Sequence, residues 1–150
     1  MRLETEKDLK EEKEIFNEVC KILKEKGHDI YYEWKPKNDQ YCHWEAIMYV
    51  DSKPYIVDLT RRFSYFSNFD DEFIGKTKYD YLIPLYRVTK DFIESKQIRP
   101  ILIVKYFDRL VSFDLTKITQ TRIENRINNG TILRFKKENY KILKEYDYKE

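Results

Sequence analysis

Residues 41–62 constrain the fold most, because polar and apolar side chains alternate on both sides of a short polar turn. Successive side chains of a β-strand point to opposite faces, so the pattern predicts two strands folded back on each other. One face is apolar and the other contains four polar side chains. The apolar face has Cys42, Trp44, Ala46, Met48, Val50, Tyr55, Val57 and Leu59, and the other has His43, Glu45, Asp58 and Thr60 beside Ile47, Tyr49 and Ile56.

The length of the turn decides which polar residues lie opposite each other. A two-residue turn, residues 51–52, places Glu45 opposite Asp58. A four-residue turn, residues 51–54, places Glu45 opposite Thr60 instead. The polar side chains share one face in both registers. Because two carboxylates held close on a strand pair repel each other, we expect a cation, a hydrogen-bond donor or a bound metal ion to compensate their charge.

The length and composition fit one globular domain over residues 1–150, with a sizeable core. The formal net charge of +2 is too small to indicate a nucleic-acid partner by itself. The charge is unevenly distributed, however, since residues 117–144 contain eight Lys or Arg against two Glu. This basic region fits either a surface that binds a polyanion or an ordinary solvated surface.

Several features favour a cytoplasmic protein without a membrane partner. Cys20 and Cys42 lie at apolar positions of a predicted helix and strand, as expected of free, buried thiols in a reducing compartment. The N-terminus is charged, unlike a signal peptide. No apolar run approaches the ~20 residues that are needed to cross a bilayer.

Helical and strand patterns alternate along the chain and predict an α/β fold, with helices flanking a mixed central sheet. A helix over residues 5–26 has one apolar stripe and ends at Gly27. A strand over residues 29–34 then precedes the hairpin. After the hairpin we predict a helix from Asp70 or Asp71 to Pro84, a helical piece from Thr89, strands over 101–107 and 110–115, a short helix over 118–127, and a final strand or helix.

The segment of residues 63–69 contains four aromatic side chains without a regular period. Such rings could stack on nucleic-acid bases or shield a site. They could equally form a small hydrophobic cluster beneath a long loop.

Common catalytic motifs are absent from the sequence. Three glycines are too few for a phosphate-binding glycine-rich loop, and two histidines exclude a multi-histidine metal site. Carboxylates suit a hard cation such as Mg²⁺, which prefers oxygen ligands and keeps most of its waters. The remaining candidate is therefore a site built from carboxylates.

The order of helix, strand, hairpin, helix and two apolar strands resembles the PD-(D/E)XK, or restriction-endonuclease-like, nucleases over about residues 10–115. Glu45 stands at the first acidic position of that family, and Asp58, Leu59 and Thr60 stand at its (D/E)-x-K triplet. The resemblance implies phosphodiester hydrolysis, on DNA rather than RNA. It also implies that Mg²⁺ or Mn²⁺ is held by Glu45, Asp58 and the backbone carbonyl of Leu59.

Two positions depart from the pattern of the family. Thr60 replaces the triplet lysine, which helps to position the attacking water and offsets charge in the transition state. The first helix of the family often supplies a Glu, but Phe16 occupies the aligned position, with Glu14 and Glu18 on either side. Residues 33–35 also spell E-x-K, yet no acidic hairpin partner precedes them, so we regard this match as coincidental.

Other residues could take the role of the missing lysine. Arg62 lies on the same face as Thr60 but cannot act as a base. Lys76 or Lys78 could reach the site from the following helix. His43 could accept a proton near neutral pH, or it could be a structural histidine.

The catalytic hypothesis therefore assigns Glu45, Asp58, Thr60 and His43 to the reaction, and Arg61, Arg62, Lys76 and Lys78 to the nucleic-acid backbone. A catalytically inactive nuclease fold that binds nucleic acid or a protein partner is the alternative, and the Thr60 substitution favours it. A third hypothesis is an accessory factor that contacts a protein through residues 63–69. The retained acidic pair opposes the inactive alternative, although Glu45 and Asp58 could instead form a structural ion cluster with Arg61, Arg62 or a helix lysine. The resemblance also allows a homodimer.

Overall fold

A computed structural model of the protein describes residues 6–34, 45–93, 96–127 and 130–147. Within these ranges the helices are α1 (Glu6–Glu25) and α2 (Lys76–Thr89), with a short 3-10 helix, η1 (Phe66–Asn68). The strands are β1 (Ile30–Trp34), β2 (Ala46–Val50), β3 (Lys53–Arg61), β4 (Asp71–Gly75), β5 (Arg99–Lys105), β6 (Arg109–Asp114), β7 (Arg122–Arg126), β8 (Gly130–Lys136) and β9 (Tyr140–Glu145). No helix in the described ranges is long and apolar enough to span a membrane.

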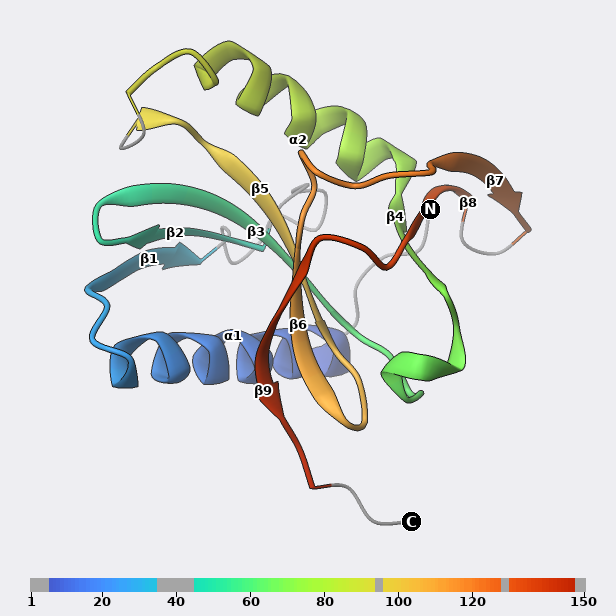
Figure 1. The fold of residues 1–150 in the computed structure, drawn as a ribbon, viewed down its shortest axis with the longest axis horizontal. Coiled ribbons are helices and arrows are strands. Elements are labelled where there is room, and N and C mark those ends of the chain that lie inside the picture. Colours follow the sequence, from blue (N-terminus) through green and yellow to red (C-terminus); the bar gives the residue numbers. More distant parts are fainter. Residues whose placement is uncertain (1–5, 35–44, 94–95, 128–129, 148–150) are drawn as a thin grey trace.

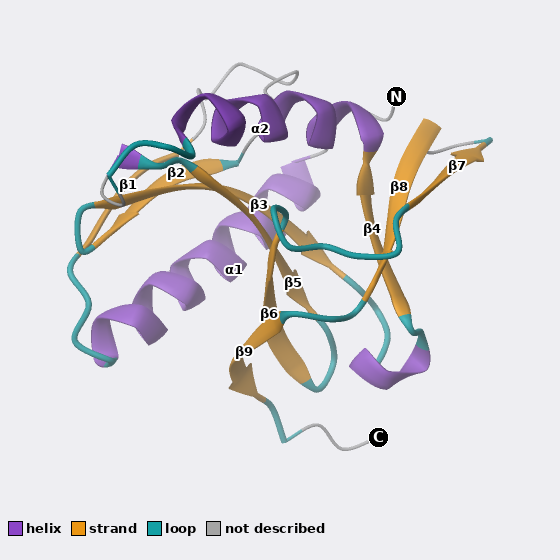
Figure 2. Ribbon diagram, turned by 45° about the horizontal axis from the view of Figure 1, so that its top comes forward, coloured by secondary structure: helices purple, strands orange, loops and turns teal. Residues whose placement is uncertain are grey.

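The strands form a six-stranded sheet in the order β1-β2-β3-β5-β6-β9 and a three-stranded sheet in the order β4-β8-β7 (Figure 2). The larger sheet is mixed, because β3 and β5 are parallel and its other neighbouring strands are antiparallel. Figure 1 shows α1 on one face of this sheet and α2 on the opposite face. The predicted architecture, a mixed central sheet flanked by helices, is confirmed.

Helix α1 covers its face of the sheet with the predicted apolar stripe. The buried residues of this layer are Ile15, Phe16, Val19, Cys20 and Ile22 of α1 with Ala46, Met48, Val57, Leu59, Ile103 and Leu110 of the sheet. The helix ends as predicted at Gly27, whose φ of 91° is left-handed. The His28 N–H donates to the Leu23 carbonyl at 3.1 Å, and the Gly27 N–H donates to the Lys24 carbonyl at 3.0 Å. This bonding satisfies the last carbonyls of the helix.

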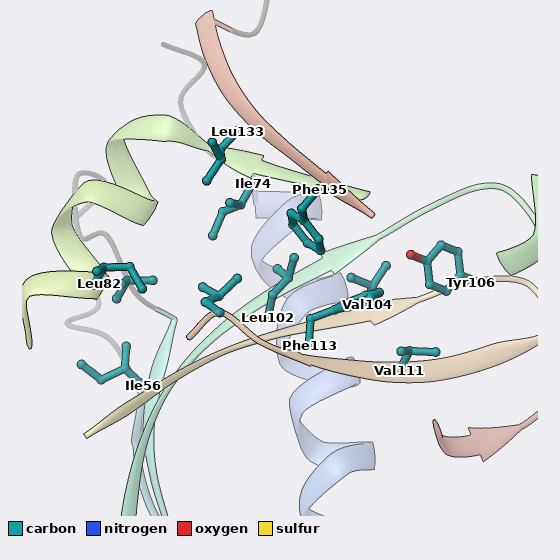
Figure 3. Packing of buried hydrophobic residues seen from close by; sticks show 12 residues of the cluster. Ile56, Ile74, Leu82, Leu102, Val104, Tyr106, Val111, Phe113, Leu133 and Phe135 are labelled. Atoms are coloured by element: carbon teal, nitrogen blue, oxygen red, sulfur yellow. The ribbon is translucent and has the colours of Figure 1, made fainter. Parts of the chain in front are cut away.

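The opposite face of the sheet is covered by α2 and by the small sheet. Figure 3 shows the two layers of this core: Ile74, Leu82, Leu133 and Phe135 pack against Leu102, Val104 and Phe113. Alternate residues of β5 therefore enter different cores, since Leu102 and Val104 face α2 and Ile103 faces α1. The predicted strand over residues 101–107 is therefore present as β5, an inner strand of the sheet that is covered on both faces.

The hairpin of β2 and β3 has the two-residue turn. Val50 pairs with Lys53, and both turn residues have positive φ, 51° at Asp51 and 70° at Ser52. Positive φ at both central residues matches the twist of the flanking strands. The pairing of Ala46 with Val57 then places Glu45 opposite Asp58.

The predicted helix from Asp70 or Asp71 to Pro84 is wrong at both ends. Residues 71–75 form β4, which pairs with β8 about sixty residues further along the chain. This long-range pairing overrides the local helix-capping signal. Helix α2 begins at Lys76 and continues through Pro84 to Thr89. Pro84 has no N–H to donate to the helix. The helix continues nevertheless, because the buried side chains of Leu82 and Ile83 anchor it beside the proline.

Two further predicted helices are absent from the described residues. The chain leaves α2 at Thr89, where a helical piece was expected to open. Residues 122–126 form β7, which pairs with β8, instead of belonging to a helix over 118–127. The terminal segment is the strand β9, which pairs with β6.

The aromatic segment of residues 63–69 divides into inward and outward rings. Phe66 packs 5.3 Å from the ring of Tyr106 and 4.9 Å from that of Tyr140. Tyr65 packs 5.5 Å from Phe107. Phe63 and Phe69 are exposed. Tyr65 and Phe66 therefore form the small hydrophobic cluster beneath the loop. Phe63 and Phe69 do not belong to it, and their rings are accessible to a binding partner.

Candidate functional site

Glu45, Asp58 and Lys78 form a charged cluster on the α2 face of the main sheet. Glu45 is 1% exposed and Asp58 4% exposed, so both carboxylates are withdrawn from solvent. The Lys78 Nζ lies 3.0 Å from Asp58 Oδ1 and 3.7 Å from Glu45 Oε1. The compensating cation that the carboxylate pair requires is thus a lysine from another element.

The chain connectivity explains how Lys78 reaches the pair. After β3, which contains Asp58, the chain leaves the main sheet, forms β4 of the small sheet and then enters α2 (Figure 1). Lys78 lies in the first turn of α2 and points toward the sheet, where it meets Asp58. Its side chain remains 35% exposed, so it lies on the solvent side of the two carboxylates.

The surroundings of Lys78 hold its ammonium group in the charged form. The carboxylate of Asp58 raises the pKa of Lys78 above its usual value, against the opposing effect of burial, and Glu45 adds to the rise. Glu12 of α1 contributes in the same direction. Three acidic residues, one in α1, one just before β2 and one in β3, therefore act on one ammonium group.

Arg62 belongs to a second, separate ion cluster. Its Nε donates to Glu72 Oε1 at 2.9 Å, and its Nη2 donates to the Phe73 carbonyl at 3.3 Å. Glu72 is buried and also accepts the hydroxyl of Tyr106 at 2.5 Å. This cluster connects the end of β3 with β4, because Glu72 stands on the small sheet.

Thr60 lies between the two clusters along β3. Its hydroxyl oxygen accepts a hydrogen bond from Arg62 Nη1 at 3.3 Å. In the described part of the chain, Thr60 therefore helps to hold Arg62 in place. The ammonium group near the carboxylates belongs to Lys78, and not to a lysine at the position of Thr60.

The other predicted residues have varied surroundings. Arg61 is exposed, with its guanidinium 5.2 Å from the ring centroid of Phe63. The Lys76 Nζ is held by Asp80 at 2.5 Å. The Leu59 side chain is buried on the α1 face, which leaves only its carbonyl for the predicted role. His43 lies outside the described residues, as do Cys42, Trp44 and the lysine of the E-x-K match.

The acidic residue that α1 brings near the site is not at the position expected from the resemblance. That position holds Phe16, which is fully buried in the core. Glu18 accepts hydrogen bonds from Lys105 Nζ at 3.0 Å and from the Tyr146 hydroxyl at 2.6 Å, away from Lys78. The acid that acts on Lys78 is Glu12. Glu12 stands one helical turn before Ile15 and Phe16, so its place on the apolar stripe was a signal that sequence reasoning overlooked.

The donor chemistry of the cluster fits a hard divalent cation. No group of three or more His, Cys, Asp or Glu side chains that could hold a metal occurs among the residues that the structure describes. Mg²⁺ does not require such a group, since one or two carboxylates with water and substrate oxygens suffice. Glu45 and Asp58 supply two carboxylates on one face, so the residues fit Mg²⁺ or Mn²⁺.

Comparisons with known proteins show a likeness to a solved structure. No protein-family model matches the sequence, and no curated protein matches it. The chain is similar to the solved structure of Archaeoglobus fulgidus Hjc, a Holliday junction resolvase from an archaeal hyperthermophile. The two chains share 7% sequence identity, and the match covers 80% of this chain and 85% of that chain, with a TM-score of 0.49.

Proposed function

We propose that this protein is a metal-dependent nuclease of the restriction-endonuclease-like type that hydrolyses phosphodiester bonds in DNA. The supporting observation is the approach of Lys78 Nζ to Asp58 Oδ1 at 3.0 Å and to Glu45 Oε1 at 3.7 Å. Two carboxylates and one ammonium are the groups that the resemblance requires. Lys78 would supply from α2 the charge that Thr60 cannot supply from the triplet.

In this proposal Glu45, Asp58 and the Leu59 carbonyl would hold Mg²⁺ or Mn²⁺. Such an ion would polarise the scissile phosphate and lower the pKa of a water bound to it. Lys78 remains protonated because its pKa is raised. It therefore stabilises negative charge on the phosphate and is not a general base near neutral pH.

The cations expected to contact the nucleic-acid backbone are unequally placed. Arg61 is exposed, but it alternates with Thr60 along β3 and therefore lies on the α1 face with Leu59, opposite the face of Asp58. Lys76 is a weak candidate, because Asp80 already holds its ammonium group. The guanidinium of Arg62 is committed to Glu72, and we assign it to positioning the end of β3. Binding through these cations should weaken steeply with salt.

A cleavage assay tests the proposal. Purified protein is incubated with supercoiled plasmid and with labelled single-stranded, duplex and branched DNA, and with RNA, in Mg²⁺ or Mn²⁺. Cleavage of DNA is expected, and EDTA should abolish it. Asp58→Asn should lower the rate by ~10²–10³, whereas Asp147→Asn, which changes an exposed acid near the chain end, should leave it unchanged. Cleavage that survives Asp58→Asn would assign the activity to another site or to a contaminant.

The burial of the carboxylates favours a second candidate, a nuclease fold without catalysis that binds nucleic acid. Glu45 and Asp58 are almost inaccessible, and Lys78 already compensates their charge. This arrangement could be structural only. Binding to DNA that EDTA does not change, with no cleavage under any divalent ion, would select this candidate.

A further inference from the structure

Four of the eight cations of residues 117–144 share one face of the small sheet. We call them the basic face: Arg122, Arg126, Arg134 and Lys136. The register places Arg122 opposite Arg134, and Arg134 opposite Phe73 of β4, so these side chains point to the same side. The alternate residues Leu133 and Phe135 point to the other side, where they are buried in the core. The basic face is therefore the side of the small sheet that is turned away from the core.

Each acidic side chain on the basic face is shared by two of its four cations. The contacts are Glu124 Oε2 with Arg134 Nη2 at 2.5 Å and with Arg126 Nε at 3.5 Å, and Asp71 with Arg122 Nη2 at 2.5 Å and with Lys136 Nζ at 3.3 Å. Four cations thus meet two carboxylates. Among the residues that the structure describes, this face therefore keeps a surplus of two positive charges.

Several guanidinium groups gather around the ring of Phe73. Its centroid lies 4.5 Å from Arg126 Cζ and 5.6 Å from Arg134 Cζ. Arg62 Cζ lies 4.2 Å from the same centroid, but Glu72 compensates its charge. The ring attracts each cation, whereas the like charges repel each other. A bound anion relieves this repulsion, and the planar donors of a guanidinium match the oxygens of a phosphate.

The cations that the nuclease resemblance implies leave the contacts to a DNA backbone largely unexplained. Arg61 lies on the α1 face of the main sheet, away from Asp58. Carboxylates already hold the charges of the other two, Lys76 and Arg62. The resemblance ends near residue 115, before β7 and β8, so it implies nothing about the basic face.

We propose that the basic face binds the phosphate backbone of DNA and leads the bound strand to the candidate site. Lys78 stands three residues after Gly75, the last residue of β4, and Figure 2 shows β4 continuing directly into α2. The first turn of α2 therefore joins the basic face to Glu45 and Asp58. Contacts to phosphates do not read bases, so this binding is independent of base sequence. The inference rests on the proposed function, because it takes DNA as the ligand.

Fluorescence anisotropy of the full chain with labelled single-stranded and duplex DNA, in EDTA and over a series of salt concentrations, tests the basic face. Its variant is R122Q/R126Q, which changes two side chains that reach solvent, 59% and 33% exposed. The dissociation constant near physiological salt should rise by about tenfold. The slope of the logarithm of affinity against the logarithm of salt concentration should become shallower by about 1.4 for single strands and about 1.8 for duplex DNA.

The matched control removes the same number of charges from the same basic region of the sequence. K141Q/K144Q changes two exposed lysines of β9, which belongs to the main sheet. This variant should bind DNA with the affinity and salt slope of the wild type. Circular dichroism confirms that each variant is folded.

A variant that strengthens binding gives an independent test. Glu124→Gln removes the acid that Arg126 and Arg134 share. It should lower the dissociation constant for DNA by about threefold and steepen the salt slope by about 0.7 to 0.9. Glu145→Gln, at an exposed position of β9, is the control and should leave both values unchanged.

The outcomes separate this interface from the proposed catalysis, because EDTA prevents cleavage during the measurement. Equal affinity and salt slope of R122Q/R126Q and the wild type would overturn the interface, even if the wild type cleaves DNA. Equal losses in R122Q/R126Q and K141Q/K144Q would overturn it too. A wild type that binds poly-glutamate but no DNA would replace it with an acidic protein partner. DNA binding that R122Q/R126Q weakens, without any cleavage by the wild type, would support the interface and remove only the catalysis.

Discussion

Replacing Lys78 with methionine is expected to lower the free energy of unfolding by about 2–3 kcal/mol near neutral pH and the rate of DNA cleavage by ~10²-fold or more. Methionine keeps the length of the side chain but removes the charge between Glu45 and Asp58. Loss of one partner from a fully buried ion pair costs ~3–5 kcal/mol. We expect less here because Lys78 is 35% exposed.

Urea unfolding followed by fluorescence measures the loss of stability. Lys76→Met, on the same turn of α2 but paired with exposed Asp80, is the control and should cost at most ~0.5 kcal/mol. Adding Asp58→Asn to Lys78→Met removes one of the two like charges and should recover part of the stability. A Lys78→Met variant as stable as the wild type would show that the carboxylates need no cation.

The pH dependence has a defined sign. Folding raises the pKa of Lys78, so its contribution to stability is complete below the usual lysine pKa of 10.5 and disappears as the pH rises through the folded value. In Lys78→Met this contribution is absent at every pH. The deficit of that variant, measured by urea unfolding, should therefore stay constant up to about pH 10 and shrink as the pH rises further and the wild type loses the contribution of Lys78.

Replacing Glu72 with alanine is expected to cost about 2–4 kcal/mol in the free energy of unfolding. The buried carboxylate of Glu72 accepts from the Arg62 guanidinium and from the Tyr106 hydroxyl. Its removal leaves both donors without this acceptor and loosens the small sheet from the end of β3. Burial raises the pKa of Tyr106, so without Glu72 the phenol still stays neutral and cannot compensate the charge of the arginine.

Glu124→Ala is the matched control for Glu72. Glu124 lies on the same small sheet and pairs with Arg134, but its side chain is 44% exposed, against 3% for Glu72. Its loss should cost no more than ~1 kcal/mol. Equal effects of the two substitutions would contradict a connecting role for Glu72.

If residues 1–150 are one domain, as predicted, thermal unfolding of the wild type should show a single transition.

Local patterns in the sequence predicted the elements whose partners lie nearby in the chain. The apolar stripe of α1 and its Gly27 stop, and the alternation across β2 and β3, were correctly interpreted. Strand β4 was assigned to a helix because its partner β8 lies far along the chain. Strand β7 was missed for a different reason. All its side chains are at least partly exposed, so it lacks the burial pattern that identifies a strand.

The sequence indicated part of the candidate site. It predicted that Glu45 and Asp58 share a face and that a cation, a hydrogen-bond donor or a metal ion compensates them. It also named Lys78 as one of the residues that could replace the missing triplet lysine. It could not choose between Lys78 and Lys76, since that choice depends on where α2 begins. The pairing of Arg62 with Glu72 could not be foreseen either, because Glu72 was assigned to a helix and not to β4.

A crystal soaked in Mn²⁺ shows whether Glu45, Asp58 and Lys78 form a metal-dependent site. Anomalous scattering locates the ion without reference to activity. We expect a manganese peak bonded to the carboxylates of Glu45 and Asp58, and its loss in Asp58→Asn. Lys78 still bridging both carboxylates at saturating Mn²⁺, with no anomalous peak beside them, would contradict a metal-dependent site.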